Sequence, residues 1–254
     1  MSDNLFSPLP TANQVAPGDI QDGPPIPWEA TEVLSEAWEK FKANAPILII
    51  STLVVFFASF LVNMIVQLPL NLITTGVQVV AQDNEVLVAL VMTVGAILGG
   101  GIQFLVNTVA MIGLTKMNLA VARGQAADLN MLTSGYGRFF TVMGTQLLVF
   151  LAVFAGIICL FIPGIIIGWG LAMAQLYAID SELGAVDCLR RSWEVMDGNK
   201  VKLFLTFFLL GIASFFAVIF TCGMGALVVM PLIGITTALI FTRVTGRTGL
   251  PAPL

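Results

Sequence analysis

The chain has 254 residues, of which 57% are hydrophobic and only 10% are charged, and its mean hydropathy is +0.96. Soluble domains carry about 25% charged residues, so this composition excludes an ordinary soluble enzyme and indicates a multi-pass helical membrane protein. The net charge of −4 and the absence of histidine argue against a nucleic-acid partner and against the commonest metal site, and we expect no cofactor.

The N-terminal segment differs in composition from the rest of the chain. Residues 1–27 contain six prolines, three aspartates and no lysine or arginine. A secretory signal needs a basic start and an apolar run, and proline at this density opposes both helix and sheet. We expect a disordered, acidic, proline-rich tail. The alternative is a short proline-rich docking segment, although a PxxP core flanked by basic residues is missing.

Four windows without a charged residue follow the tail, and each is long enough to hold a membrane-spanning helix. We expect a turn at Pro163-Gly164 to divide the third window and a turn at Cys222-Gly223 to divide the fourth. Beyond Pro69 the first window becomes mixed, which suggests an interfacial helix rather than a second span. The predicted membrane domain covers residues 28–246, and residues 247–254 form a short tail. The six predicted spans lie near residues 46–68, 86–115, 139–162, 165–179, 203–221 and 226–242.

The basic residues predict the orientation of these spans. All 11 lysines and arginines lie before the first span, between the second and third, between the fourth and fifth, or after the sixth. The connection from Pro69 to Glu85 carries no basic residue. Because loops rich in lysine and arginine stay in the cytoplasm, both termini are expected to be cytoplasmic.

A constant shift along the sequence superposes two segments that precede spans. Trp38 aligns with Trp193, and Ala58-Ser59-Phe60 aligns with Ala213-Ser214-Phe215. In both segments apolar residues at helical spacing form one stripe, which predicts an amphipathic elbow helix with its tryptophan as an interfacial anchor. A fainter version occupies residues 129–136. The expected fold is therefore all-α and integral to the membrane, with six transmembrane helices as three parallel-repeated hairpins and with interfacial elbow helices on the cytoplasmic side.

Several of these motifs occur together in a known family. They are Pro163-Gly164-Ile165, Arg191-Ser192-Trp193, Gly198-Asn199 ahead of Leu203-Phe204, and Cys222-Gly223-Met224-Gly225 followed by Pro231. In these motifs the chain resembles a bacterial polytopic integral-membrane family of unknown function, which is similar to the membrane domain attached to some glycerophosphodiester phosphodiesterases. The resemblance covers residues 28–246 and implies a bacterial cytoplasmic (inner) membrane location. The phosphodiesterase domain is missing from this sequence, so the resemblance carries over no catalytic residue.

The polar side chains inside the predicted spans are amides rather than ionisable groups. Asn63 and Gln67 are four residues apart, as are Gln103 and Asn107, so each pair shares one helix face. We expect these amides to form hydrogen bonds between helices. The alternative is a polar path for an uncharged solute or a lipid headgroup. The candidate intramembrane polar cluster consists of Asn63, Gln67, Gln103, Asn107, Gln146 and Gln175.

Glycines four residues apart occur in two of the spans. Gly95 and Gly99 belong to the second span, and Gly164 and Gly168 belong to the fourth. This spacing lets helix backbones approach closely, so we expect these glycines to pack helices together. The alternative is that the consecutive glycines from Gly99 onward break the second span and open a site at its midpoint.

Enzymatic activity is not expected. Without histidine, the serine and cysteine side chains lack the usual activating base. We expect Asp180, Asp187 and Asp197 to solvate loops and cap helices rather than bind a metal. Cys159 and Cys222 fall at the outer ends of spans, where we expect buried packing residues and where a disulfide is the alternative.

The sequence thus predicts a non-enzymatic scaffold, a subunit of a membrane complex or a membrane-homeostasis factor. The alternative is a channel or transporter for an uncharged or lipid-like substrate. The expected partners are membrane lipid and either other membrane-protein subunits or further copies of the chain.

Overall fold

The computed structural model describes residues 22–81, 84–134 and 136–248. All regular secondary structure in the described residues is helical, and six of the helical segments are long and apolar enough to cross a membrane. This confirms the predicted class, an all-α protein with six candidate spans. The helices are α1 (Ala30–Val80), α2 (Glu85–Ala122), α3 (Phe139–Cys159), α4 (Phe161–Gly170), α5 (Ala174–Asp180), α6 (Ala185–Val195), α7 (Lys200–Phe220) and α8 (Ala226–Thr245), with short 3-10 turns η1 (Leu129–Thr133) and η2 (Tyr136–Arg138) before α3.

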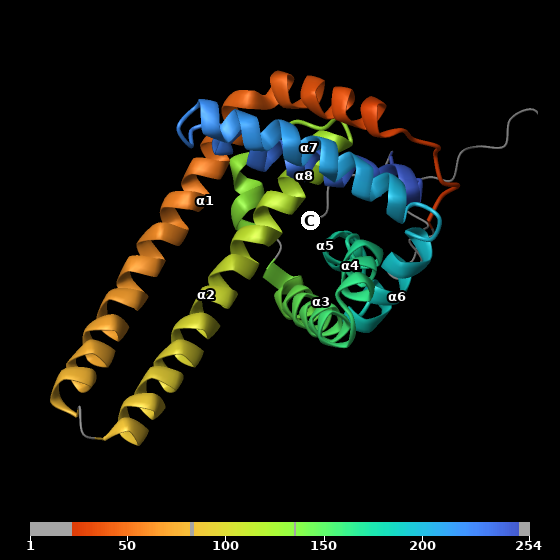
Figure 1. Ribbon diagram of the computed structural model, residues 1–254. Helices are drawn as coiled ribbons and strands as arrows, with labels where there is room; N and C mark the ends of the chain where they lie inside the picture. Colours follow the sequence, from red (N-terminus) through yellow and green to blue (C-terminus); the bar gives the residue numbers. More distant parts are fainter. Residues whose placement is uncertain (1–21, 82–83, 135, 249–254) are drawn as a thin grey trace, which may run out of the picture.

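Helix α1 unites three segments that the sequence suggested were separate. The first elbow segment, the first span and the residues beyond Pro69 form one helix of 51 residues, with Pro46 and Pro69 inside it. A proline removes one backbone hydrogen bond and presses on the preceding turn, so a helix bends there. Figure 1 shows a sharp bend between the red-orange first part of α1 and its long orange second part. The helix therefore continues to Val80 instead of ending near residue 68.

The candidate spans form three hairpins, α1–α2, α3–α4–α5 and α7–α8. The orange part of α1 and the yellow part of α2 lie side by side and extend away from the other helices (Figure 1). Helix α3 packs along α4, and α7 contacts α8. The first part of α1 lies along α8, and the main contacts between different hairpins are those of α1 and α2 with α8 (Figure 1).

The turn between α3 and α4 lies at Leu160 rather than at Pro163-Gly164, and the predicted turn is wrong. Leu160 alone has an extended backbone (φ −162°, ψ 136°), and α4 begins directly after it. Pro163 is the third residue of α4. A proline in the first turn of a helix gives up no hydrogen bond, because the first N–H groups have no intrahelical acceptor. Here the proline starts a helix instead of separating two.

The fourth span is broken between Gly170 and Ala174, and α6 fills the break. The Ser192 hydroxyl accepts a hydrogen bond from the backbone N–H of Met173 (3.1 Å) and donates one to the carbonyl of Gly170 (2.9 Å). Trp193 packs so closely on Gly170 that a Cβ there would lie 2.4 Å from the ring atom Cε3. The backbone groups that the break frees are thus bonded within the protein, as an apolar environment requires.

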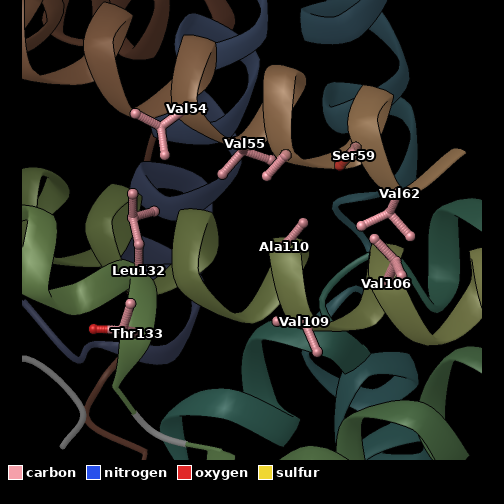
Figure 2. A pocket seen from close by; sticks show the side chains of 10 residues that line it. Val54, Val55, Ser59, Val62, Val106, Val109, Ala110, Leu132 and Thr133 are labelled. Atoms are coloured by element: carbon pink, nitrogen blue, oxygen red, sulfur yellow. The ribbon is translucent and has the colours of Figure 1, made fainter. Parts of the chain in front are cut away.

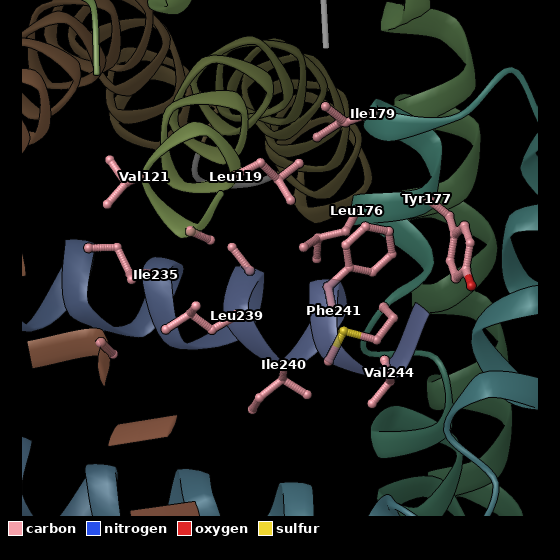
Figure 3. Close-up of a cluster of buried hydrophobic side chains, with 14 of the residues drawn as sticks. Leu119, Val121, Leu176, Tyr177, Ile179, Ile235, Leu239, Ile240, Phe241 and Val244 are labelled. Carbon is pink, nitrogen blue, oxygen red and sulfur yellow. The ribbon is translucent and has the colours of Figure 1, made fainter. Parts of the chain in front are cut away.

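The buried core lies at the base, where the end of α2, α5 and α8 meet. Figure 3 shows Leu119, Leu176, Tyr177 and Phe241 converging there, and the rings of Tyr177 and Phe241 meet edge to face with their centroids 5.0 Å apart. Half of the most apolar window of α8 is buried, against 11% for α1 and 6% for α2. The α1–α2 hairpin is therefore largely uncovered along its length, whereas α8 is buried along much of its length.

Residues 22–28 form a strap across the end of α8. The N–H of Gly23 donates to the carbonyl of Thr245 and the N–H of Ile26 to that of Arg243, each at 2.8 Å. Gly246 has φ +67°, and a Cβ on it would lie 2.6 Å from the carbonyl carbon of Gly23, so the position favours glycine on both counts. Residues 22–27 are thus hydrogen-bonded to the end of α8, although the sequence assigned them to the tail. The rest of that tail, residues 1–21, lies outside the described residues.

The repeat remains a prediction. The second elbow segment is a separate helix, α6, whereas the first is continuous with the span that follows it. The faint middle copy forms the 3-10 turns η1 and η2 rather than an α-helix. Residues 124–137 include three glycines, which disfavour a longer helix.

Candidate functional site

The amides of the first two spans form a chain of hydrogen bonds along the α1–α2 interface. The Asn63 Nδ2 group donates to Gln103 Oε1 at 3.2 Å, and Gln103 Nε2 donates to Asn107 Oδ1 at 3.2 Å. Each amide side chain can accept and donate, so one row can link two helices. The bond from Asn63 to Gln103 joins α1 to α2 in the way expected of the amides, whereas the bond from Gln103 to Asn107 lies within α2. Together the three side chains form a polar track on the hairpin.

A second polar contact links α2 to α3. The Thr108 hydroxyl, which is buried, lies 2.7 Å from Gln146 Oε1, and Gln146 Nε2 lies 3.2 Å from the sulfur of Met111. Gln67 lies against Gly99 on the α1–α2 interface. Gln175 is half-buried on α5, at the base. The structure therefore brings five of the six predicted amides to helices α1, α2 and α3 and leaves Gln175 apart.

An apolar groove lies beside this polar track. It has a volume of about 360 Å³ and runs between α1, α2 and η1. Figure 2 shows Val55 and Val62 of α1 facing Val106 and Ala110 of α2, with Leu132 of η1 at one end. The small side chains of Ala58, Ser59 and Ala110 widen the gap between the two helices. The groove suits an acyl chain or an apolar side chain.

The four glycines expected to pack helices differ in how closely they contact their neighbours. A Cβ on Gly99 would lie 3.0 Å from Gln67 Nε2, and one on Gly164 would lie 2.7 Å from the backbone nitrogen of Ile157, so both occupy close helix contacts. Gly95 is 3.3 Å from a methyl group of Thr74 by the same measure, whereas Gly168 has only an ordinary contact at 3.8 Å. Helix α2 continues without interruption through its consecutive glycines. The midplane opening considered as an alternative is therefore not formed.

The most strongly bonded polar group was missed by the sequence analysis. We call it the basal cluster, and it consists of Asp22, Arg123, Tyr177, Asp180 and Arg247. Arg123 Nη2 lies 2.6 Å from Asp180 Oδ2, with the two side chains 0% and 3% exposed. Arg247 pairs with Asp22 at 2.8 Å and with Asp180 at 3.3 Å. The hydroxyl of Tyr177 donates to Asp22 Oδ2 at 2.9 Å.

The basal cluster joins segments far apart in the sequence: the strap, the end of α2, the end of α5 and the end of α8. Asp180 was expected to solvate a loop, and that expectation is wrong, since its carboxylate holds two buried guanidinium groups. A buried charge whose partner is removed is strongly destabilising. The basal cluster therefore stabilises the packing of these four segments at the base. No local sequence motif predicts the basal cluster, because each of its charged members alone resembles an ordinary charged residue near the end of a span.

Arginine side chains also tie the base together at its edge. Arg243 on α8 pairs with Glu32 at 2.8 Å and with Glu36, both on the first part of α1. Arg138 pairs with Glu182 at 2.8 Å and donates to the carbonyl of Ala178 at 2.9 Å. Arg138 and Arg243, whose positions in the sequence predicted only the orientation of the spans, thus also connect helices through ion pairs.

The two tryptophans of the elbow segments are only partly exposed. Trp38, 45% exposed, stacks on the buried ring of Phe41 with centroids 5.6 Å apart. Trp193, 40% exposed, carries the Lys200 ammonium 3.7 Å above its ring. An apolar body against the protein and a free edge outward is typical of an interfacial anchor.

The three cysteines are free thiols, and two of them are more exposed than expected. Cys159 and Cys222 are exposed, whereas Cys188 on α6 is buried. Burial is the main cause that raises the pKa of the Cys188 thiol to about 11. Its sulfur lies 3.9 Å from the carbonyl oxygen of Leu183. Cys188 is therefore a packing residue with little thiolate at neutral pH.

Among the residues that the structure describes, no three His, Cys, Asp or Glu side chains come together in a way that could hold a metal ion. A scan against protein-family models, a search of curated proteins and a search of solved structures each return no match to this chain. The family resemblance noted from the sequence motifs thus stays a prediction.

Proposed function

We propose that this chain is a non-enzymatic scaffold or subunit of a membrane complex in a bacterial inner membrane. The supporting observation is the contrast between the buried ion pairs at the base and the apolar surfaces of α1, α2 and α7, which are largely uncovered. Large apolar side chains along α1 and α7 are more than half exposed, among them Ile65 (71%) and Phe215 (62%). Extended apolar surfaces of this kind mark contacts with lipid or with another protein.

The orientation proposed for the scaffold has both termini in the cytoplasm. The strap and the end of α8 are hydrogen-bonded to each other, so the two ends of the described chain share one side of the molecule. The same side carries the arginines of the basal cluster. Both observations agree with the positive-inside rule applied to the sequence.

The test is purification of the full chain in native nanodiscs, followed by quantitative mass spectrometry. A scaffold co-purifies with one membrane protein, or with a second copy, at a fixed ratio. One variant replaces exposed side chains of α1 by alanine, namely Phe57, Phe60 and Ile65. A matched variant makes the same change on α7, at Phe208, Phe215 and Ile219. The expected result is that one variant loses the partner and the other keeps it, while the free energy of unfolding of both variants equals that of the native chain.

The second candidate function is movement of an uncharged or lipid-like substrate, which the apolar groove beside the amide chain favours. A lipid has an acyl chain for the groove and a polar head for Asn63, Gln103 and Asn107. The assay is flux into liposomes, with leucine at these three positions as the test variant. Substrate-specific flux that this variant abolishes, without any stoichiometric partner in nanodiscs, contradicts the scaffold and supports transport.

A further inference from the structure

The polar track of the α1–α2 hairpin lies inside the hydrocarbon wherever the hairpin crosses the membrane. A span needs about 20 residues. Every stretch of that length within residues 46–80 of α1 contains Asn63, and every such stretch of the charge-free run 86–115 of α2 contains Gln103. Hydrocarbon offers no hydrogen-bond partner, so an amide left unbonded there is costly.

The described chain leaves both ends of the polar track unbonded. Asn63 donates to Gln103 and Gln103 donates to Asn107, each at 3.2 Å. In the part of the chain that the structure describes, the side-chain oxygen of Asn63 accepts no hydrogen bond and the side-chain nitrogen of Asn107 donates none. Both side chains are exposed. The track therefore presents an unused acceptor at one end and an unused donor at the other.

The polar track is part of an exposed surface that we call the amide face. It consists of Asn63 on α1 and of four residues of α2, namely Ala96, Gly100, Gln103 and Asn107. The four residues of α2 follow one another at intervals of four, three and four, so they share one side of that helix. A Cβ added to Gly100 would meet no other atom within 4 Å. The space in front of Gly100 therefore lets a neighbouring helix approach the two amides of α2 closely.

A second copy of the chain has the groups that the polar track lacks. An amide both donates and accepts, so a surface of amides is complementary to itself. In a two-fold dimer the same patch meets its own copy, and Asn107 of each copy can donate while Asn63 of each copy can accept. The amide face holds no charged residue, so two copies bring no like charges together. Both copies carry the same orienting basic residues, which places the two-fold axis along the membrane normal.

We propose that the chain forms a homodimer in the membrane through the amide face, with hydrogen bonds between the two polar tracks. Polar side chains that bond across closely packed helices are a known source of helix association in membranes. This inference rests on the proposed scaffold function and identifies a second copy of the chain as one of its partners.

The test measures association of the full chain in liposomes. Copies labelled at the C-terminus with a donor dye or an acceptor dye are reconstituted together at a series of protein-to-lipid ratios. Energy transfer between the dyes then gives the dissociation constant. The expected result is energy transfer that falls on dilution with lipid and follows a monomer–dimer equilibrium.

Two pairs of variants locate the contact. Gly100→Leu places a large side chain on the amide face, and Gly101→Leu places the same side chain about 100° around the helix. Both glycines are exposed and have open space around them, so both variants should fold. Asn107→Leu removes the unused donor, and Asn71→Leu makes the same change at an exposed asparagine outside the amide face.

The first member of each pair should weaken the dimer about tenfold or more, because each copy then loses a contact with the other. Gly101→Leu and Asn71→Leu should dimerise like the native chain. Thermal unfolding of each variant confirms that it is folded. If Asn107→Leu does not fold, the comparison of Gly100→Leu with Gly101→Leu still decides the outcome.

Two results overturn the inference. One is equal dimerisation of Gly100→Leu and Gly101→Leu, which places the contact on another surface. The other is the absence of energy transfer at every protein-to-lipid ratio. In that case a different membrane protein at a fixed ratio in nanodiscs preserves the scaffold function, and the absence of any partner contradicts that function as well. A phospholipid that native mass spectrometry finds on this monomer, and that Asn107→Leu loses, assigns the polar track to a lipid headgroup.

Discussion

Burial, rather than distance, should decide how much each ion pair at the base contributes to stability. Asp180 and Glu182 are two residues apart, and the nearest arginine lies at nearly the same distance from each, 2.6 Å for Arg123 and 2.8 Å for Arg138. Asp180 also pairs with Arg247 at 3.3 Å. The Asp180 side chain is 3% exposed and that of Glu182 is 63% exposed. The two carboxylates therefore differ in burial and in the number of arginine partners, and burial is expected to dominate the difference in stability.

Replacing Asp180 by alanine leaves two buried guanidinium groups without their shared carboxylate. Breaking a buried ion pair on one side costs about 3–5 kcal/mol. Glu182→Ala breaks an exposed pair, which contributes about 1 kcal/mol or less because water screens it. The expected difference between the two variants is therefore about 2–4 kcal/mol in the free energy of unfolding.

The assay is unfolding in mixed micelles of rising dodecyl sulfate content, followed by tryptophan fluorescence and circular dichroism. A double variant, Asp180→Ala with Arg123→Met, completes a thermodynamic cycle, and Arg123→Met should cost less in that background than in the native chain. Equal loss of stability in Asp180→Ala and Glu182→Ala, within about 1 kcal/mol, refutes the reasoning that burial makes the basal cluster dominant.

Four further predictions follow from single contacts. Gly164→Ala should lower the free energy of unfolding by about 1–3 kcal/mol, because the added Cβ meets the α3 backbone, whereas Gly168→Ala should be neutral or stabilising. Thermal unfolding of the two variants tests this, and equal effects contradict the assignment of Gly164 to a close helix contact. Iodoacetamide should alkylate Cys188 in the folded chain about a hundredfold more slowly than in the unfolded chain at pH 8, since its pKa rises from 9.0 to about 11, and equal rates contradict its burial. Ser192→Ala should cost about 1–3 kcal/mol, because it leaves two backbone groups of the broken span unpaired, and a chemical unfolding curve that coincides with the native one argues against that role. A cysteine at Gln78 should react with an impermeant maleimide in intact cells, and reaction only after permeabilisation reverses the proposed orientation.

The candidate spans were predictable from the sequence because they depend on local composition. A long window without charge forms a helix in a bilayer almost whatever its order of residues. The helix ends were less predictable. Pro163 looked like a separator and proved to be in the first turn of α4, and Pro69 lies inside α1. A proline has the same local signature at a helix start, at a bend and at a turn, and the packing of neighbouring helices selects among them.

The base could not be predicted from the sequence, because its contacts join residues that are far apart. Asp180 and Arg247 each precede or follow a span in the way that ordinary loop charges do. Only the meeting of α5 and α8 places them at ion-pair distance. The contacts of the intramembrane amides were partly predictable. Their spacing predicted one face on each helix, and the approach of α1 to α2 joined Asn63 to Gln103.

The strap across α8 has a consequence for how the protein is made. Asp22 and Arg247, which pair in the basal cluster, are separated by 225 residues. A ribosome that adds about 5–20 residues per second needs roughly 10–45 s between them. All six candidate spans are synthesised in that interval, while the arginine partner of Asp22 does not yet exist. The base therefore closes only when the last helix is complete, and a chain that stops before Arg247 carries an open base that membrane proteases can recognise.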